Sequence, residues 1–318
     1  YALSLFWALE RDAGRLADTA ARADAMPLGS GALAGSAFPL DRDFMARELG
    51  FSRVTPNSLD AVSDRDYFIE ALGALSMTMI HLSRYCEDLI LWSSAEFGFV
   101  ELDDAYSTGS SMMPQKKNPD SLELVRGKSG RVVGGLVSLL MAMKGLGLTY
   151  GKDLQEDKEP VFDAFDTVTD CLEVFTAAWA TMTVHGQRME EAIDAGALAT
   201  DLADYLVDRG VPFREAHHVI GDLVRGTIAS GGTLTGLSHA DLHAHDERFG
   251  PDAVDCLNLR ASLERRNLPG GTGPASVAVQ LEQAAAILVA VEAMPAAAEA
   301  MPAAAEARQD ATGGGSDE

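Results

Sequence analysis

The chain has 318 residues, and its 48 acidic and 25 basic side chains give it a net charge of −23. This charge disfavours nucleic acid and anionic membranes as partners, because both are bound through lysine and arginine. No apolar run reaches the roughly 18 residues of a membrane-spanning helix, and the longest candidate, Val132–Met143, ends at a lysine. The three cysteines are far apart and fit a reducing compartment, so we expect a cytoplasmic protein of about two domains.

The pattern of apolar residues predicts an all-α fold. Residues 1–24 have helical spacing, residues 29–37 form a loop of small residues, and residues 41–49 form a short helix. Longer helices of about 40 Å are expected near residues 66–97, 119–146 and 161–182. The middle one contains four glycines, which we expect to allow close approach of a neighbouring backbone: Gly127, Gly130, Gly134 and Gly135.

Two of the long helices carry heptad repeats, which favour a long-helix bundle shared between subunits. In the first, the apolar positions are Phe68, Leu72, Leu75, Met79, Leu82, Cys86 and Leu89. In the second, the same stepping gives Val161, Phe165, Val168, Leu172, Phe175, Trp179 and Met182. A monomeric bundle that closes on itself is the alternative.

The long-helix pattern ends near Gly186, which predicts a change of domain. We assign residues 1–190 to the central bundle and residues 191–292 to a small C-terminal helical domain with helices near 200–209, 214–229 and 274–292. Residues 293–318 contain two copies of AMPAAAE and end in ATGGGSDE. This low-complexity tail is expected to be disordered.

The segment from Thr108 to Asp120, TGSSMMPQKKNPD, lies between two long helices and has the properties of an anion site. Asn118 is predicted to cap a helix that begins at Pro119, and the free N–H groups of a helix start attract negative charge. Lys116 adds a full positive charge. An ordinary capped loop with solvated lysines is the alternative interpretation.

The order of residues in this segment resembles the signature of the aspartase/fumarase superfamily, and SSMMPQKKNPD followed by Glu123 resembles the argininosuccinate lyase family in particular. Three further stretches are similar to that family. They are NSLD with SDRD at residues 57–66, YGKDLQEDKE at 150–159, and ADYLVDRGVPFREAHH within 200–218. The resemblance implies the superfamily's helical bundle, no cofactor or metal, a homotetramer with shared active sites, and β-elimination of argininosuccinate to arginine and fumarate.

The same resemblance implies roles for individual residues. Ser110 would be the catalytic acid/base at the carbon that loses its proton, and Lys116 and Asn118 would hold the neighbouring carboxylate. Preorganised donors of this kind stabilise the dianion formed when a proton leaves beside a carboxylate. The implied substrate contacts from a neighbouring subunit are Tyr150, Gln155 and Lys158. Arg65 is a further candidate anion contact, with an ion pair to Asp64 or Asp66 as the alternative.

The sequence departs from the family at its start. The family's catalytic histidine lies in a Thr-His segment before the position of Tyr1, and that histidine would pair with Glu123. YALSLFW at residues 1–7 reads as the interior of a helix without a start signal. We therefore expect an N-terminal part outside this chain, and a chain that is inactive by itself.

None of the seven histidines is a convincing substitute. His81 lies in a heptad helix and is expected to be a satisfied interface residue. His239, His243 and His245 have a spacing that could bind zinc with Asp246, but a solvated helix face is the preferred interpretation. The alternatives to the favoured function are a sister lyase acting on adenylosuccinate, aspartate or malate, and a non-catalytic structural homologue on the same scaffold.

Overall fold

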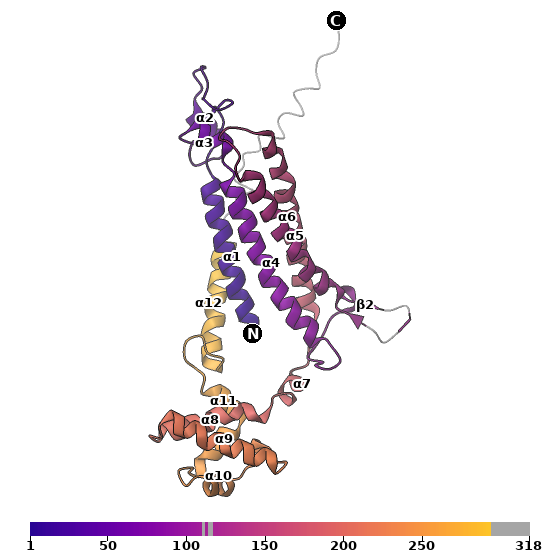
Figure 1. Ribbon diagram of the computed structural model, residues 1–318, viewed down its shortest axis with the longest axis vertical. Helices are drawn as coiled ribbons and strands as arrows, with labels where there is room; N and C mark the ends of the chain where they lie inside the picture. Colours follow the sequence, from indigo (N-terminus) through magenta and orange to yellow (C-terminus); the bar gives the residue numbers. More distant parts are fainter. Residues whose placement is uncertain (110–111, 114–116, 294–318) are drawn as a thin grey trace. The chain divides into compact units, whose positions relative to one another are not determined.

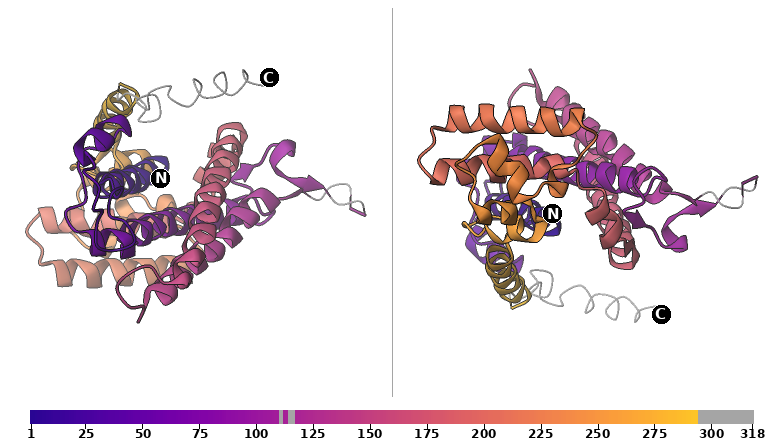
Figure 2. Two further views of the ribbon diagram at one scale, coloured as in Figure 1. Left: turned by 90° about the horizontal axis from the view of Figure 1, so that it is seen from above. Right: turned by 90° about the horizontal axis from the view of Figure 1, so that it is seen from below.

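The computed structural model describes residues 1–109, 112–113 and 117–293, which form two compact units, residues 1–185 and 186–291 (Figures 1 and 2). Apart from its first residue, the predicted tail at 293–318 lies outside the described residues. The first unit is built on four long helices: α1 (Ala2–Ala23), α4 (Asp66–Trp92), α5 (Asp120–Met143) and α6 (Lys158–Thr181). Helix α4 packs against the other three, and α5 also packs against α6. The predicted all-α bundle is confirmed.

The heptad prediction for α4 is confirmed from its second position onward, because Leu72, Leu75, Met79, Leu82, Cys86 and Leu89 are all buried, whereas Phe68 is only partly buried. On α6 the predicted phase is partly wrong. The buried stripe runs through Val161, Ala164, Val168, Cys171, Phe175 and Ala178. Phe165 is 43% exposed, because small residues rather than the aromatic ring face the neighbouring helices.

The expected role of the α5 glycines holds for only one of the four within this chain. A side chain at Gly135 would meet the backbone oxygen of Pro160 at 3.4 Å. Gly127, Gly130 and Gly134 face open space instead. They share their side of the helix with exposed apolar side chains, including Leu124, Val137 and Met141. Helix α5 therefore has an uncovered stripe of small and apolar residues.

Short elements occupy the two ends of this bundle. At one end lie α2 (Arg42–Glu48), α3 (Ser58–Ser63) and the 3-10 turn η2 (Lys152–Asp157). The other end carries the 3-10 turn η1 (Asp104–Tyr106) and two antiparallel ladders. In the ladders, β1 (Val100–Glu101) pairs with β4 (Thr183–Val184), and β2 (Thr108–Gly109) pairs with β3 (Lys117–Asn118). Figure 1 shows β2 and the α2–α3 pair at opposite ends.

The predicted cap of α5 is wrong by one residue. Asn118 belongs to β3, where it pairs with Thr108, and the helix begins at Asp120 with Pro119 in the cap position. The hydroxyl of Thr108 donates to the carboxylate of Asp120. The ladder thus takes the backbone of Asn118 away from the helix, and an acidic residue still occupies the first turn.

The second unit consists of short helices around its own core. They are α7 (Gly186–Glu191), α8 (Ala199–Asp208), α9 (Phe213–Ala229), α10 (His239–His245), α11 (Leu259–Glu264) and α12 (Pro274–Glu292), with the 3-10 turns η3 (Ala195–Leu198), η4 (Leu234–Gly236) and η5 (Pro251–Leu257). Phe249 is fully buried at the core and stacks on Tyr205. The hydroxyl of Tyr205 donates to Asp252 at 2.6 Å and accepts the N–H of Gly250 at 3.0 Å.

Helix α12 is the one described helix that is long and apolar enough to cross a membrane by length and composition, with 11% of the apolar window buried. The search for unbroken apolar runs missed it, because Gln280, Glu282 and Gln283 interrupt the pattern. A core helix meets the same criterion, so this observation by itself assigns no location to α12.

Candidate functional site

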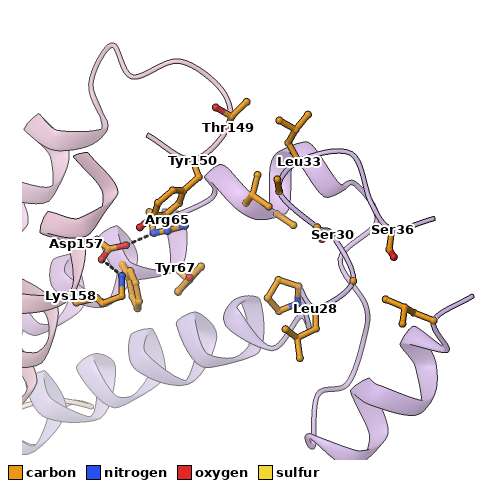
Figure 3. Close-up of a pocket in the computed structure, with 18 residues that line it drawn as sticks. Leu28, Ser30, Leu33, Ser36, Arg65, Tyr67, Thr149, Tyr150, Asp157 and Lys158 are labelled. Carbon is orange, nitrogen blue, oxygen red and sulfur yellow. Dashed lines mark hydrogen bonds and ion pairs between the residues drawn. The ribbon is translucent and has the colours of Figure 1, made fainter. Parts of the chain in front are cut away.

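A pocket of about 1010 Å³ lies at the end of the bundle where α4 and α6 begin. Figure 3 shows its lining residues in two groups. One wall carries Arg65, Tyr67, Tyr150, Asp157 and Lys158. The other wall is the loop of small residues between 27 and 36. The pocket therefore combines three segments that are far apart in the sequence.

The charged wall is organised by Asp157, whose side chain is only 1% exposed. Its carboxylate accepts a hydrogen bond from Arg65 at 2.5 Å and one from Lys158 at 2.9 Å. Burial works to raise the pKa of Asp157, but the hydrogen bonds and charges of Lys158 and Arg65 outweigh it, so the pKa lies below its ordinary value. Two cations share one carboxylate, which leaves this wall with a net positive charge.

The alternative considered for Arg65, an ion pair with Asp64 or Asp66, is wrong. Arg65 pairs with Asp157, and Asp64 contributes only its backbone oxygen at 2.5 Å. The carboxylate of Asp64 instead accepts the N–H of Asp66 at the start of α4. The sequence analysis gave no role to Asp157, although it lies in the motif at residues 150–159. Its partner, Arg65, lies 92 positions away, so no local pattern marks the pair.

Tyr150 enters the pocket from the segment between α5 and η2. Its hydroxyl oxygen accepts a hydrogen bond from the side-chain amide of Gln155. The preceding residue, Thr149, has φ of 111°, the one positive value among described non-glycine residues. A β-branched residue in this region is strained by about 1–3 kcal/mol, and such strain persists only where the surrounding structure enforces it. The surrounding structure therefore fixes the backbone just before Tyr150, and with it the position from which the Tyr150 ring enters the pocket.

The opposite wall is anchored by Arg42 at the start of α2. Its guanidinium donates to the backbone oxygens of Leu28 at 2.8 Å and Thr55 at 3.2 Å, and to the Thr55 hydroxyl at 3.0 Å. Gly29 has φ of +89°, and a Cβ there would lie 3.0 Å from the Arg42 side chain. Sequence analysis identified this segment only as a small-residue loop and did not find its place in a pocket.

The signature segment lies at the other end of the bundle. Ser110 and Lys116 are outside the described residues. Asn118 lines a separate pocket of about 240 Å³ with Lys117 and His185. Glu123 is exposed in the first turn of α5 and makes no ion pair within the described part of the chain. With a rise of 1.5 Å per residue, the 24 residues of α5 place these groups about 30 Å or more from Tyr150 and Lys158.

The histidines considered as substitutes are engaged elsewhere. Nδ1 of His81 lies 2.7 Å from the buried carboxylate of Asp12, which joins α4 to α1. In the second unit, ring nitrogens of His239 and His243 lie 3.2 and 3.1 Å from the backbone oxygen of Phe249. Among the described residues, no group of three or more histidine, cysteine or acidic side chains is arranged to hold a metal ion.

Known proteins similar in sequence to this chain are lyases. Residues 3–134 match the family described as "Lyase", and residues 196–264 match the family described as "Argininosuccinate lyase C-terminal". The chain is 53% identical over 292 residues to argininosuccinate lyase of Moorella thermoacetica, covering 92% of this chain and 63% of that protein. It is 52% identical over 283 residues to argininosuccinate lyase of Thermus thermophilus, covering 89% and 61%.

A solved structure shares the fold. The crystal structure of EDDS lyase in complex with formate superimposes with a TM-score of 0.82 and 29% identity, over 89% of this chain and 58% of that one. The chain thus spans about 60% of the length of the proteins it matches. The signature, the two matched regions and these similarities relate the chain to the argininosuccinate lyases among the aspartase/fumarase lyases.

Proposed function

We propose that the protein is an argininosuccinate lyase, a carbon–nitrogen lyase that cleaves argininosuccinate to L-arginine and fumarate without a cofactor. The observation that carries this proposal is the positive pocket of Arg65, Tyr150 and Lys158, on the same chain as the signature segment. Argininosuccinate carries three carboxylates. Donors in the pocket and in the signature segment suit a substrate that is anionic at both of its ends, provided that the two come together from different copies of the chain.

The signature segment would carry out the elimination. Ser110 would exchange the proton at the carbon next to the succinyl carboxylate, and Lys116 and Asn118 would stabilise the dianion that results. Glu123 is exposed and free to orient a histidine brought to it. The matched relatives are longer than this chain, and we place that histidine in sequence outside residues 1–318, so that these residues alone would be inactive.

The site would be shared between copies of the chain. The pocket and the signature segment are separated by the length of α5, which is more than a molecule of argininosuccinate can span. A second copy lying antiparallel would bring its signature segment to the first copy's pocket. The uncovered stripe of Gly127, Gly130 and Gly134 with apolar neighbours on α5 suits such close helix packing. We propose a homotetramer, the assembly implied by the family, acting in the cytoplasm.

The direct test is fumarate release by the protein expressed from its full reading frame. Argininosuccinate should be turned over, and adenylosuccinate, aspartate and malate should not compete. Ser110→Ala should remove nearly all turnover while circular dichroism stays unchanged. Turnover of a competing substrate in place of argininosuccinate would reject the proposed specificity. An oligomer size equal to one chain, measured by light scattering, would reject the shared site.

A further inference from the structure

Two buried side-chain hydroxyls lack a hydrogen-bond partner among the described residues, and one of them lines the pocket. They are the Oγ atoms of Ser30 and Ser76. Ser30 is 3% exposed and belongs to the loop wall, as Figure 3 shows, whereas Ser76 lies within α4 and is not among the lining residues. Burying a hydroxyl without a partner is unfavourable, so a group that paired with Ser30 would remove a cost already present in the fold.

The backbone around Ser30 offers further donors. The N–H of Gly35 donates to the oxygen of Ser30 at 2.8 Å and closes a tight turn. Gly31 has φ of +62°, and a Cβ there would lie 2.5 Å from the Gly35 oxygen, so this turn requires glycine. In the described part of the chain, the N–H groups of residues 31–34 donate to no backbone oxygen. These residues are exposed, so their N–H groups can be solvated, and the buried hydroxyl of Ser30 is the donor of this wall that lacks any partner.

The wall that faces Ser30 also favours a negatively charged ligand. Arg65 and Lys158 share Asp157, whose two oxygens are occupied by them. The pocket therefore presents donors on both sides, and a carboxylate satisfies them better than an ammonium group does. The Arg42 guanidinium fixes the loop wall from behind through its bond to Leu28, so the donors keep their positions.

We propose that loop 27–36 is a carboxylate-binding subsite in which the hydroxyl of Ser30 donates to the ligand. This inference rests on the proposed function in its choice of ligand. Because the signature segment would hold the succinyl carboxylates, the pocket receives the other end of argininosuccinate. The ligand group is thus the α-carboxylate of the arginine half, and Ser30 is a specificity-determining residue.

The test compares Ser30→Ala with Ser76→Ala as a matched control. Each substitution removes one buried hydroxyl without a partner, so neither should lower the melting temperature. Calorimetry with L-arginine and with agmatine, which lacks the carboxylate, measures binding without turnover. Ser30→Ala should weaken L-arginine binding roughly tenfold and leave agmatine binding unchanged, whereas Ser76→Ala should change neither.

The outcomes separate the subsite from the proposed function. Equal L-arginine binding by wild type and Ser30→Ala overturns the subsite, even if argininosuccinate is cleaved. The same is true if wild type does not bind L-arginine, or if Ser76→Ala weakens binding as strongly. A wild-type protein expressed from its full reading frame that binds L-arginine through Ser30 but does not cleave argininosuccinate supports the subsite and contradicts the proposed function.

Discussion

Two inactive variants should restore activity to each other if every active site takes its residues from two copies of the chain. Ser110→Ala disables the signature segment, and Lys158→Ala disables the pocket. Along α5 these two groups are separated by about 30 Å or more, so one substrate molecule cannot contact both within one copy. A mixed oligomer contains some sites in which an intact signature segment meets an intact pocket.

The expected recovery follows from random assembly of equal amounts of the two variants. A site has Ser110 in half of the cases and, independently, Lys158 from the other copy in half of the cases. Roughly a quarter of the sites are therefore complete, which predicts roughly a quarter of the wild-type rate per mass of protein. Each variant alone should give only residual turnover.

The assay is fumarate release after the two variants are unfolded, mixed and refolded together. A mixture of Ser110→Ala with Glu123→Gln is the control, because both changes lie in the same segment and no hybrid site can be intact. Wild-type protein taken through the same procedure measures the loss during refolding. Recovery no greater than that of the control mixture would refute the shared site.

Three further predictions concern the walls and the core. Asp157→Asn should lower the free energy of unfolding by about 2 kcal/mol, less than for a fully buried pair because one cation is half exposed. Since the folded-state pKa of Asp157 is lowered, its stabilisation is present above about pH 4 and is lost in stronger acid, so urea unfolding curves of the two proteins should converge there. Arg42→Lys should raise the KM for argininosuccinate with kcat nearly unchanged in steady-state kinetics, because lysine lacks the planar fork that holds the loop. Phe175→Ala should cost about 3–5 kcal/mol in chemical denaturation, whereas the exposed Phe165→Ala should mainly weaken self-association in sedimentation.

The sequence was sufficient to predict the long helices, and it failed where two apolar stripes compete. On α4 the predicted stripe from Leu72 to Leu89 is the buried one, and apolar residues off it such as Ile80 and Leu91 are exposed. On α6, both Ala164 and Phe165 fit a stripe that contains Val161 and Val168. A prediction from periodicity chooses Phe165, because its side chain is larger and more apolar. In the structure Ala164 is buried instead, and its small side chain lets the neighbouring helices come closer to α6. Which stripe is buried depends on the neighbour, so the sequence of one helix cannot decide it.

At the candidate site, too, residues within local motifs could be predicted, and residues whose role depends on distant contacts could not. Arg65, Tyr150 and Lys158 could be named from motifs, and the structure places them around one pocket. Asp157 was missed because its pairing with Arg65 joins segments 92 residues apart. Ser30 gave no signal, because a serine among glycines and alanines has neither charge nor periodicity to mark it. Its significance depends on burial without a partner, which only the fold creates.

If the site is shared between copies as proposed, the surface between them has a second requirement to meet. That surface has to hold the copies together, and it also has to fix their alignment along the helix axis. A slip of one turn moves the two halves of the site apart by about 5.4 Å, which is more than a hydrogen bond can bridge. Flat apolar surfaces resist such a slip poorly, whereas gaps at Gly127, Gly130 and Gly134 accept side chains only at matching positions. The glycines on the open face of α5 are therefore suited to set the register on which catalysis would depend.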